Sequence, residues 1–260
     1  MDWFEKLTGF PEASYSETKR KLIVENGKLR SRVNGASYGI GHLELVSLDT
    51  LRARAAGESG PRGQLKVSLV NGNVRAMHAD PAHAGALFQV ASQFNLLEMV
   101  GPDVTPEHGV ARYQFDHTQG PACAIAAGAA TMFRNYFAPV AGGYGQTANR
   151  QINAIADLGA ALSQAMGTNI DTLWTMRNGY LMATRPGLEA VSSYLQTLSG
   201  AERDQMRARL CIGIHTDVEV TDVQGPEPHL VSQAFCSALP IAYNQDRGPL
   251  WEPFALLVLE

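Results

Sequence analysis

A helix of very small residues, placed directly behind a polar turn, limits the folds open to this chain. The stretch reads YQFDHTQGPACAIAAGAATMFRNYF, residues 113–137. A strand-like run ends at Asp116, and the helix that follows has Thr118 as its expected N-cap and Pro121 in its first turn. The N–H groups of that turn favour an anion, and small side chains let a ligand come close. The alternative is that these small residues serve only close packing on a sheet.

Composition narrows the class of protein. The 260 residues suit one large α/β domain better than two small ones. The charge is balanced, with 21 basic and 25 acidic residues, so nothing indicates nucleic acid as a partner. Three cysteines in apolar runs favour buried thiols over a disulfide framework. Neither a secretory signal nor an apolar run long enough for a bilayer is visible, so we expect no membrane partner and a cytoplasmic location.

The pattern along the chain predicts a sheet whose strands alternate with helices. Residues 1–64 read as an irregular N-terminal extension that packs on the core, and residues 65–260 as the main domain. Strands are expected at 65–72, at 74–80 and before Asp116, and strand-rich segments at 209–221 and 229–244. Helices are expected at 149–166, at 188–198 and from about residue 250. Such alternation favours an α/β fold with sites outside the carboxyl ends of the strands.

Four carboxylates precede the small-residue helix. Between residues 98 and 116 the only fixed positive charge is Arg112. Acids beside an anion-binding helix start are electrostatically odd unless the ligand also carries a cation or needs acid–base chemistry at a sugar. A solvated loop rich in turn formers explains them equally well. The four acids are Glu98, Asp103, Glu107 and Asp116.

The stretch HADPAH, residues 78–83, contains metal-ligand types. His78, Asp80 and His83 lack a clear third and fourth partner nearby, so no metal site is assigned. Asp80 at a strand end could accept a hydrogen bond from an exocyclic amine, and an Asx turn before Pro81 is about equally plausible. No histidine has a serine or cysteine at a nucleophile elbow, so no catalytic triad is predicted.

Taken together, these motifs resemble the macrodomain superfamily, whose members bind ADP-ribose at the top of a mixed sheet flanked by helices. The motifs occur in the same order: HAD at 78–80, QFN at 93–95, TQGPACAIAAG at 118–128 and FCSALPIAY at 235–243. The usual glycine-rich loops are replaced by the acidic loop 98–119 and by Cys-Ser-Ala-Leu-Pro. These departures resemble the divergent MavL-like branch, which is associated with removing ADP-ribose from arginine. The similarity covers residues 65–260.

This resemblance implies a role for individual residues. Asp80 would hold the adenine amine, Asn95 the distal ribose, and Tyr144 or Tyr243 would pack on ribose or base. The diphosphate would lie on the backbone of 120–124 and 237–242. The implied ligand-binding set is Asp80, Asn95, Thr118, Gln119, Gly120, Cys123, Ala124, Tyr144, Ser237, Ala238, Leu239, Ala242 and Tyr243.

The expected function is hydrolysis of mono-ADP-ribose from a protein side chain, with arginine as the expected acceptor and no cofactor. Asp116 and Glu107 would be the main catalytic residues, and Glu98 or Asp103 would bind the guanidinium. The expected partners are ADP-ribose and a mono-ADP-ribosylated protein. Two alternatives stay open: a module that binds ADP-ribose without cleaving it, and a metal-dependent hydrolase centred on His78, Asp80 and His83.

Overall fold

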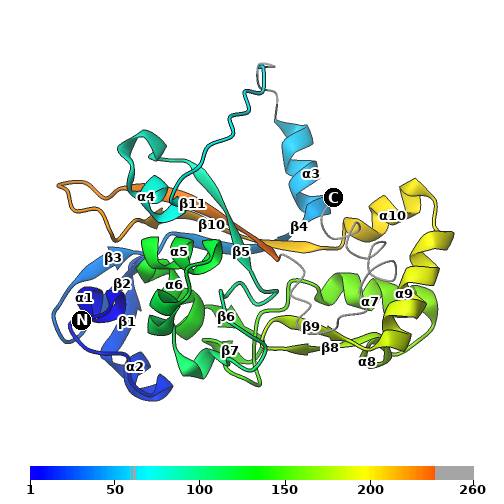
Figure 1. The fold of residues 1–260 in the computed structure, drawn as a ribbon, viewed down its shortest axis with the longest axis horizontal. Coiled ribbons are helices and arrows are strands. Elements are labelled where there is room, and N and C mark those ends of the chain that lie inside the picture. The colour runs from blue at the N-terminus through cyan, green and yellow to red at the C-terminus, as the bar shows by residue number, and fades with distance from the viewer. Residues whose placement is uncertain (59, 61–62, 238–260) are drawn as a thin grey trace.

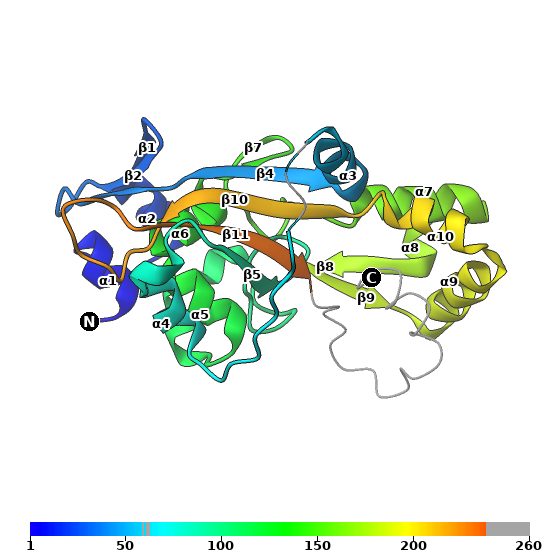
Figure 2. The ribbon, with the colours of Figure 1, turned by 90° about the horizontal axis from the view of Figure 1, so that it is seen from above.

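A mixed four-stranded sheet forms the centre of the molecule. The computed structural model describes residues 1–58, 60 and 63–237. The strand order is β4 (His42–Ser47), β10 (Cys211–Glu219), β11 (Leu230–Ser237) and β5 (Leu87–Ser92), seen from above in Figure 2. β10 runs antiparallel to β4 and β11, whereas β11 and β5 are parallel. With helices beside this sheet, the predicted α/β class is confirmed (Figure 1).

Two groups of elements flank the sheet, one below it and one at the end where β10 begins (Figures 1 and 2). The small-residue stretch forms α5 (Gln119–Ala126) and α6 (Gly128–Tyr136), which lie below the sheet beside the N-terminal elements (Figure 1). Almost every residue of α6 is buried, as expected for a helix with neighbours on all sides. The second group is α7 (Ala156–Met166), α8 (Ile170–Leu173), β8 (Trp174–Arg177), β9 (Tyr180–Ala183), α9 (Arg185–Thr197) and α10 (Gly200–Arg207).

The N-terminal region is more ordered than the sequence predicted. Instead of an irregular extension it contains α1 (Trp3–Thr8), α2 (Tyr15–Lys21), a three-stranded sheet of β1 (Leu22–Glu25), β2 (Lys28–Ser31) and β3 (Ser37–Gly39), then β4 and α3 (Leu48–Gly57). Asn26 and Gly27 both have positive φ in the turn between β1 and β2. An Asn-Gly pair is a strong hairpin signal, and it was missed. Through β4, this region also supplies one strand of the central sheet.

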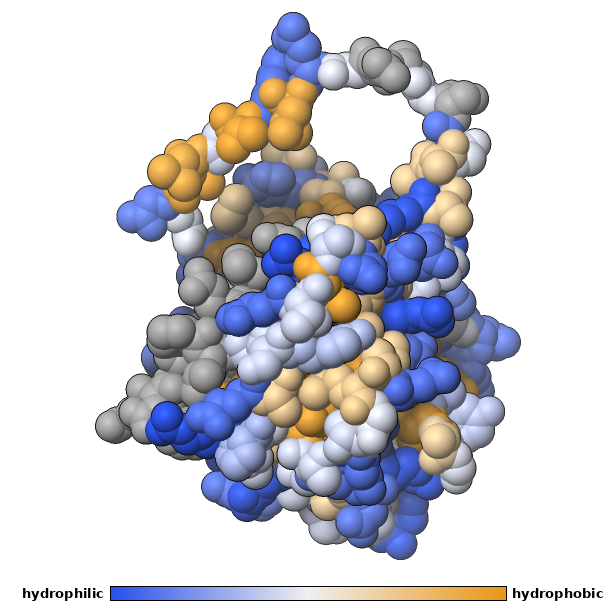
Figure 3. Space-filling model, turned by 90° about the vertical axis from the view of Figure 1, so that its right-hand side faces the viewer, coloured by the Kyte–Doolittle hydropathy of each residue, from blue (hydrophilic) through white to orange (hydrophobic). Residues whose placement is uncertain are grey.

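The strands predicted at 65–72 and 74–80 are wrong. Residues 65–72 form no helix or strand, and Leu65, Val67 and Leu69 are exposed on a protruding segment (Figure 3). Alternating apolar residues form a strand only where a hydrogen-bonding partner is present. The second segment is α4 (Val74–Ala79), because the Asn73 side chain accepts hydrogen bonds from the N–H groups of Arg75 and Ala76 and caps a helix there.

The strand expected before Asp116 is also wrong. Ala111–Phe115 forms a short 3₁₀ helix, η3, and two more such turns occur at Pro81–His83 (η1) and Pro106–His108 (η2). Aromatic residues near 113 suggested a strand, yet Tyr113 is fully buried as the inner side of this turn. The chain therefore reaches α5 from a helical turn, with Asp116 as the first extended residue.

The remaining predictions agree with the structure in part. The predicted helix at 188–198 and the strand at 209–221 are confirmed as α9 and β10. The predicted helix at 149–166 begins only at Ala156, and a short antiparallel ribbon of β6 (Pro139–Val140) and β7 (Gly143–Tyr144) precedes it. The strand in 229–244 is confirmed up to Ser237, while the turn beyond it and the final helix lie outside the described residues. None of the described helices is long and apolar enough to cross a membrane.

The start of α5 is attached to the outer edge of the central sheet. The Gln119 side chain accepts a hydrogen bond from the N–H of Ala91 at 2.7 Å and donates one to the carbonyl of Gln89 at 2.6 Å. It thereby satisfies backbone groups on the free edge of β5, as a neighbouring strand would. Gly120 makes this approach feasible, because a Cβ there would lie 2.0 Å from the Ala91 carbonyl oxygen.

This close contact predicts a large effect of one methyl group. We expect Gly120→Ala to lower the free energy of unfolding by about 1–3 kcal/mol, because the backbone of β5 must move away. Gly200→Ala is the matched control, since a Cβ at the start of α10 meets nothing within 4 Å. Urea unfolding of both variants measures the difference. Equal stability of the two variants would contradict the proposed close approach.

Candidate functional site

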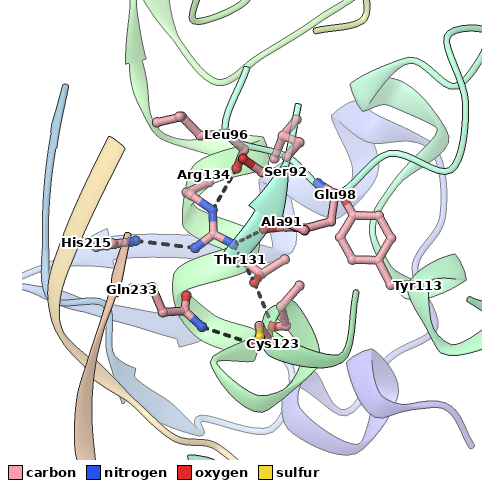
Figure 4. A network of polar contacts seen from close by, with 12 residues as sticks. Ala91, Ser92, Leu96, Glu98, Tyr113, Cys123, Thr131, Arg134, His215 and Gln233 are labelled. Atoms are coloured by element: carbon pink, nitrogen blue, oxygen red, sulfur yellow. Dashed lines mark hydrogen bonds and ion pairs between the residues drawn. The ribbon is translucent and has the colours of Figure 1, made fainter. Parts of the chain in front are cut away.

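A buried arginine organises the polar interior below the sheet. Arg134, on α6, has no exposed side-chain surface. Its Nε donates to the carbonyl of Leu96 at 3.1 Å, and one terminal nitrogen donates to Glu98 and to Thr131, each at 3.0 Å (Figure 4). The guanidinium carbon lies 4.3 Å from the ring centre of Phe235 on β11. One cation therefore ties α6 to the loop after β5 and to the sheet.

The other terminal nitrogen of Arg134 faces His215 on β10, 3.4 Å from Nδ1. Because a guanidinium only donates, Nδ1 must accept, and the proton of His215 stands on Nε2. Burial, followed by the Arg134 cation, lowers the pKa of His215 well below its usual value. His215 is therefore a neutral acceptor, and it completes the network on the sheet side (Figure 4).

Glu98 is the acid of this network, and only one of its oxygens has a partner. Oε1 accepts from Arg134, and the buried Oε2 has no hydrogen-bond partner among the described residues. The backbone N–H of Glu98 donates to the Tyr113 hydroxyl at 3.2 Å. Burial raises the pKa of the Glu98 carboxyl to about 7, although Arg134 acts in the opposite direction. The carboxyl thus carries a proton over a much wider pH range than an ordinary glutamate.

A cavity lies where β5 ends and α5 begins. Its volume is about 260 Å³, and Glu98 and Asp116 both line it. Gly120 brings the helix start next to Glu98, since a Cβ at this position would be 3.2 Å from the Glu98 Cγ. The remaining lining residues come from the end of β5, the loop behind it and the start of α5: Ala91, Ser92, Gln93, Met99, Thr118, Gln119, Gly120 and Pro121.

Asp116 occupies the common border of three cavities. It lines the one described above and two wider ones of about 690 and 570 Å³, which flank α5 and η3. One of its oxygens accepts from the backbone N–H of Thr118 at 2.8 Å and from the Thr118 hydroxyl at 2.5 Å. The half-buried carboxylate is thereby held at the N-terminus of α5, where the helix dipole stabilises negative charge. The exposed ring of Phe115 borders the 570 Å³ cavity.

Two of the four predicted acids lie elsewhere. Both oxygens of Glu107 are 2.9 Å from the backbone N of Ala148, and Glu107 lines none of these three cavities. Asp103 is exposed and forms an ion pair with Arg177 of β8. The structure therefore brings Asp116 and Glu98 to one cavity and separates them from Glu107 and Asp103.

The residues predicted for the adenine and distal ribose do not meet at this cavity. Asp80 follows α4 rather than a strand. Its side chain accepts a hydrogen bond from the N–H of Ala82, as in the Asx turn that was the alternative prediction. Asn95 is fully buried and binds the N–H of Leu97 and the Gln151 side chain. Tyr144 is 67% exposed in the short ribbon of β6 and β7. Sequence order alone did not reveal these positions.

The predicted phosphate-binding segments are closer to expectation. Thr118 is the N-cap of α5, and Gln119 and Gly120 line the cavity, while Cys123 and Ala124 are buried further along the helix. Ser237 ends β11 in register with Ser92, a cavity residue at the end of β5. The predicted ligand-binding residues Ala238, Leu239, Ala242 and Tyr243 lie outside the described part of the chain.

The histidines of HADPAH have structural partners. His78 is buried, with Nδ1 2.7 Å from the Val74 carbonyl and its ring stacked on Phe88. His83 Nδ1 lies 2.9 Å from the Met77 carbonyl. Within residues 1–58, 60 and 63–237, no group of three or more His, Cys, Asp or Glu side chains is arranged to hold a metal ion.

Sequence reasoning missed the residues that position Glu98. Arg134, His215 and Tyr113 are brought together by tertiary packing, so no local spacing predicts their contact. One signal was present: Arg134 is the only charged residue in residues 118–137, a run otherwise composed of uncharged side chains. A charge in such a run is rarely buried unless it is paired, so a partner was to be expected.

Comparisons with known proteins identify no relative. No family model matches this sequence, and neither a curated protein nor a solved structure matches it significantly. The site has to be interpreted from its own geometry.

The environment of Glu98 predicts a dependence of stability on pH. The carboxyl has an ordinary pKa of 4.5 when unfolded and about 7 when folded, so the folded state binds more protons between these values. The free energy of unfolding therefore falls as the pH rises from about 4.5 to about 7. We expect the stability of the native chain relative to Glu98→Gln to decrease by up to about 3 kcal/mol across this interval.

Urea unfolding at pH 5, 6, 7 and 8 tests this prediction. The comparison with Glu98→Gln cancels the titration of the histidines, which both proteins share. A stability difference that stays constant from pH 5 to pH 8 would contradict the raised pKa of Glu98.

Proposed function

We propose that this protein is a hydrolase that removes mono-ADP-ribose from a protein side chain, with arginine as the acceptor. The observation that carries the proposal is the position of Asp116 between the 260 Å³ cavity and two wider ones, directly at the N-terminus of α5. An elongated ligand with a diphosphate and two sugars needs a helix start for its phosphates and a carboxylate at its reacting sugar. The motif order that resembles the divergent macrodomains supports the same choice.

The proposed mechanism uses few groups. Cleavage of the N-glycosidic bond passes through an oxocarbenium-like state, which a nearby carboxylate stabilises while it orients the attacking water. Asp116 serves here because Oδ1 is held by Thr118, whereas no hydrogen bond from the described residues engages its second oxygen. Carboxylates recognise the guanidinium of the modified arginine. When the C–N bond breaks, its electron pair stays on the guanidine nitrogen, and the strongly basic guanidine takes up the proton that the attacking water loses as the new C–O bond forms.

A second candidate is a module that binds ADP-ribose without cleaving it. The distribution of the acids favours it: Glu107 and Asp103 are engaged outside the cavity, and Oε1 of Glu98 is held by Arg134. This leaves Asp116 as the one acid of the four whose carboxylate is half-buried at the cavity mouth. A binding module and a hydrolase differ in turnover and not in affinity, so only a rate measurement separates them.

The decisive measurement is release of free ADP-ribose over time from a protein mono-ADP-ribosylated on arginine, with a carboxylate-linked substrate beside it. We expect release from the arginine substrate and a decrease of about 10²–10⁴-fold for Asp116→Asn. The asparagine oxygen still accepts the N–H of Thr118, so the start of α5 is retained. Absence of release from both substrates, together with ADP-ribose binding, would establish the binding module instead.

Glu107→Gln is the control variant for this assay. Its side-chain oxygen can still accept the N–H of Ala148, and it lines none of the three cavities around Asp116. We expect its rate to stay within about threefold of the native rate, because it removes a charge without touching the site. A loss as large as that of Asp116→Asn would show that Glu107 takes part in the reaction and that the assignment to Asp116 alone is incomplete.

A further inference from the structure

The start of α5 offers two backbone donors to the cavity. Gln119 and Gly120 are the first two residues of the helix, so their N–H groups have no acceptor within it. Both residues line the 260 Å³ cavity. The third residue, Pro121, has no N–H, so two donors remain on this side. Two N–H groups and a helix dipole are a suitable but incomplete site for an oxyanion.

The buried carboxyl of Glu98 is a second feature of this cavity, separate from the helix start. Its side chain is 1% exposed, it lines the same cavity, and Oε2 has no partner among the described residues. A buried carboxyl oxygen without a partner is costly, so natural proteins rarely leave one without a ligand or a function. Oε1 is fixed by Arg134, so Oε2 is the carboxyl oxygen of this cavity-lining residue that has no partner among the described residues.

We propose that Glu98 acts as a carboxylic acid whose Oε2–H donates a hydrogen bond to a phosphate oxygen held at the start of α5. This inference rests on the proposed function, because it names the group that binds the diphosphate of ADP-ribose. Glu98 then belongs to phosphate recognition, whereas Asp116 acts at the sugar. The site accepts an oxyanion with three donors: the N–H groups of Gln119 and Gly120 and the acid of Glu98.

The titratable groups around Glu98 are consistent with this protonation state. Arg134 on α6 is the cation and Asp116 behind η3 is an acid at the same cavity, while Tyr113 on η3, Cys123 on α5 and His215 on β10 are neutral. Burial outweighs the single cation, so the pKa of Glu98 is about 7 in the free protein. A bound anion would favour the proton further, because a carboxylate beside a phosphate is repelled.

Binding should therefore take up a proton. At pH 8 most of the free protein has an ionised Glu98, and the bound state would have the acid. We expect uptake of about 0.9 proton per ADP-ribose at pH 8, about half at pH 7 and almost none at pH 5.5. Affinity should fall by up to about tenfold for each pH unit above 7.

Isothermal titration calorimetry of the full chain, in buffers that differ in ionisation enthalpy, measures this uptake. Glu98→Gln is the matched variant: Arg134 needs an acceptor, so the amide oxygen faces it and the NH₂ group faces the cavity. We expect this variant to bind ADP-ribose at pH 8 as tightly as the native protein binds it at pH 5.5, without proton uptake. Weaker binding of Glu98→Gln at every pH would instead indicate an ionised Glu98 that accepts from a hydroxyl or a cation, and would overturn the proposal.

Two further binding measurements distinguish a failure of this inference from a failure of the proposed function. A histidine can also take up a proton near neutral pH, so His117→Gln is measured in parallel, and loss of the uptake there would overturn the assignment to Glu98. Inorganic pyrophosphate is titrated as a second probe. Binding of pyrophosphate with Glu98-dependent uptake, but no binding of ADP-ribose, would support the oxyanion site and refute the hydrolase. ADP-ribose binding without proton uptake would refute only the role of Glu98.

Discussion

The buried cation of Arg134 is the interaction on which the rest of this structure depends. A guanidinium in a dry interior is tolerated only when nearly all its donors are used. Here they bind the Leu96 carbonyl, Glu98, Thr131 and His215, while the face of the group lies on Phe235. These partners belong to a loop, a helix and two strands, so satisfying one charge fixes the relative positions of all of them.

This arrangement also explains why a buried carboxyl group lines the cavity at the start of α5. Arg134 binds one oxygen of Glu98, and the close approach of Gly120 to β5 brings the helix start beside the same side chain. Gln119 meanwhile occupies the free edge of β5. The small residues of α5 thus have two effects: they permit tight packing on the sheet, and they leave helix N–H groups accessible at a cavity.

How well each site residue could be predicted depends on whether its partners are near to it or far from it in the sequence. Thr118 and Asp116 bind each other across only two residues, a contact that turn chemistry makes predictable from sequence. Asp80 and Asn95 were placed by their order in the motifs, and in the structure the side chain of each accepts a hydrogen bond from a backbone N–H two residues further on. Glu98 was selected as one of four similar acids, and nothing in the loop sequence distinguished the acid that becomes buried from Asp103, which stays exposed.

The sequence by itself determined the α/β class, the strand β10 and the helix α9, because these depend on periodicity and, for α9, on a cap within a few residues. It also determined the helix start at Thr118, where a polar turn leads into a first turn that contains Pro121. Only the tertiary structure decided that β4 joins the central sheet, that residues 65–72 remain unpaired, and that Glu98 meets Arg134. Strand pairing and burial depend on partners far away in the chain, and the free energy of a buried charge depends on which groups surround it.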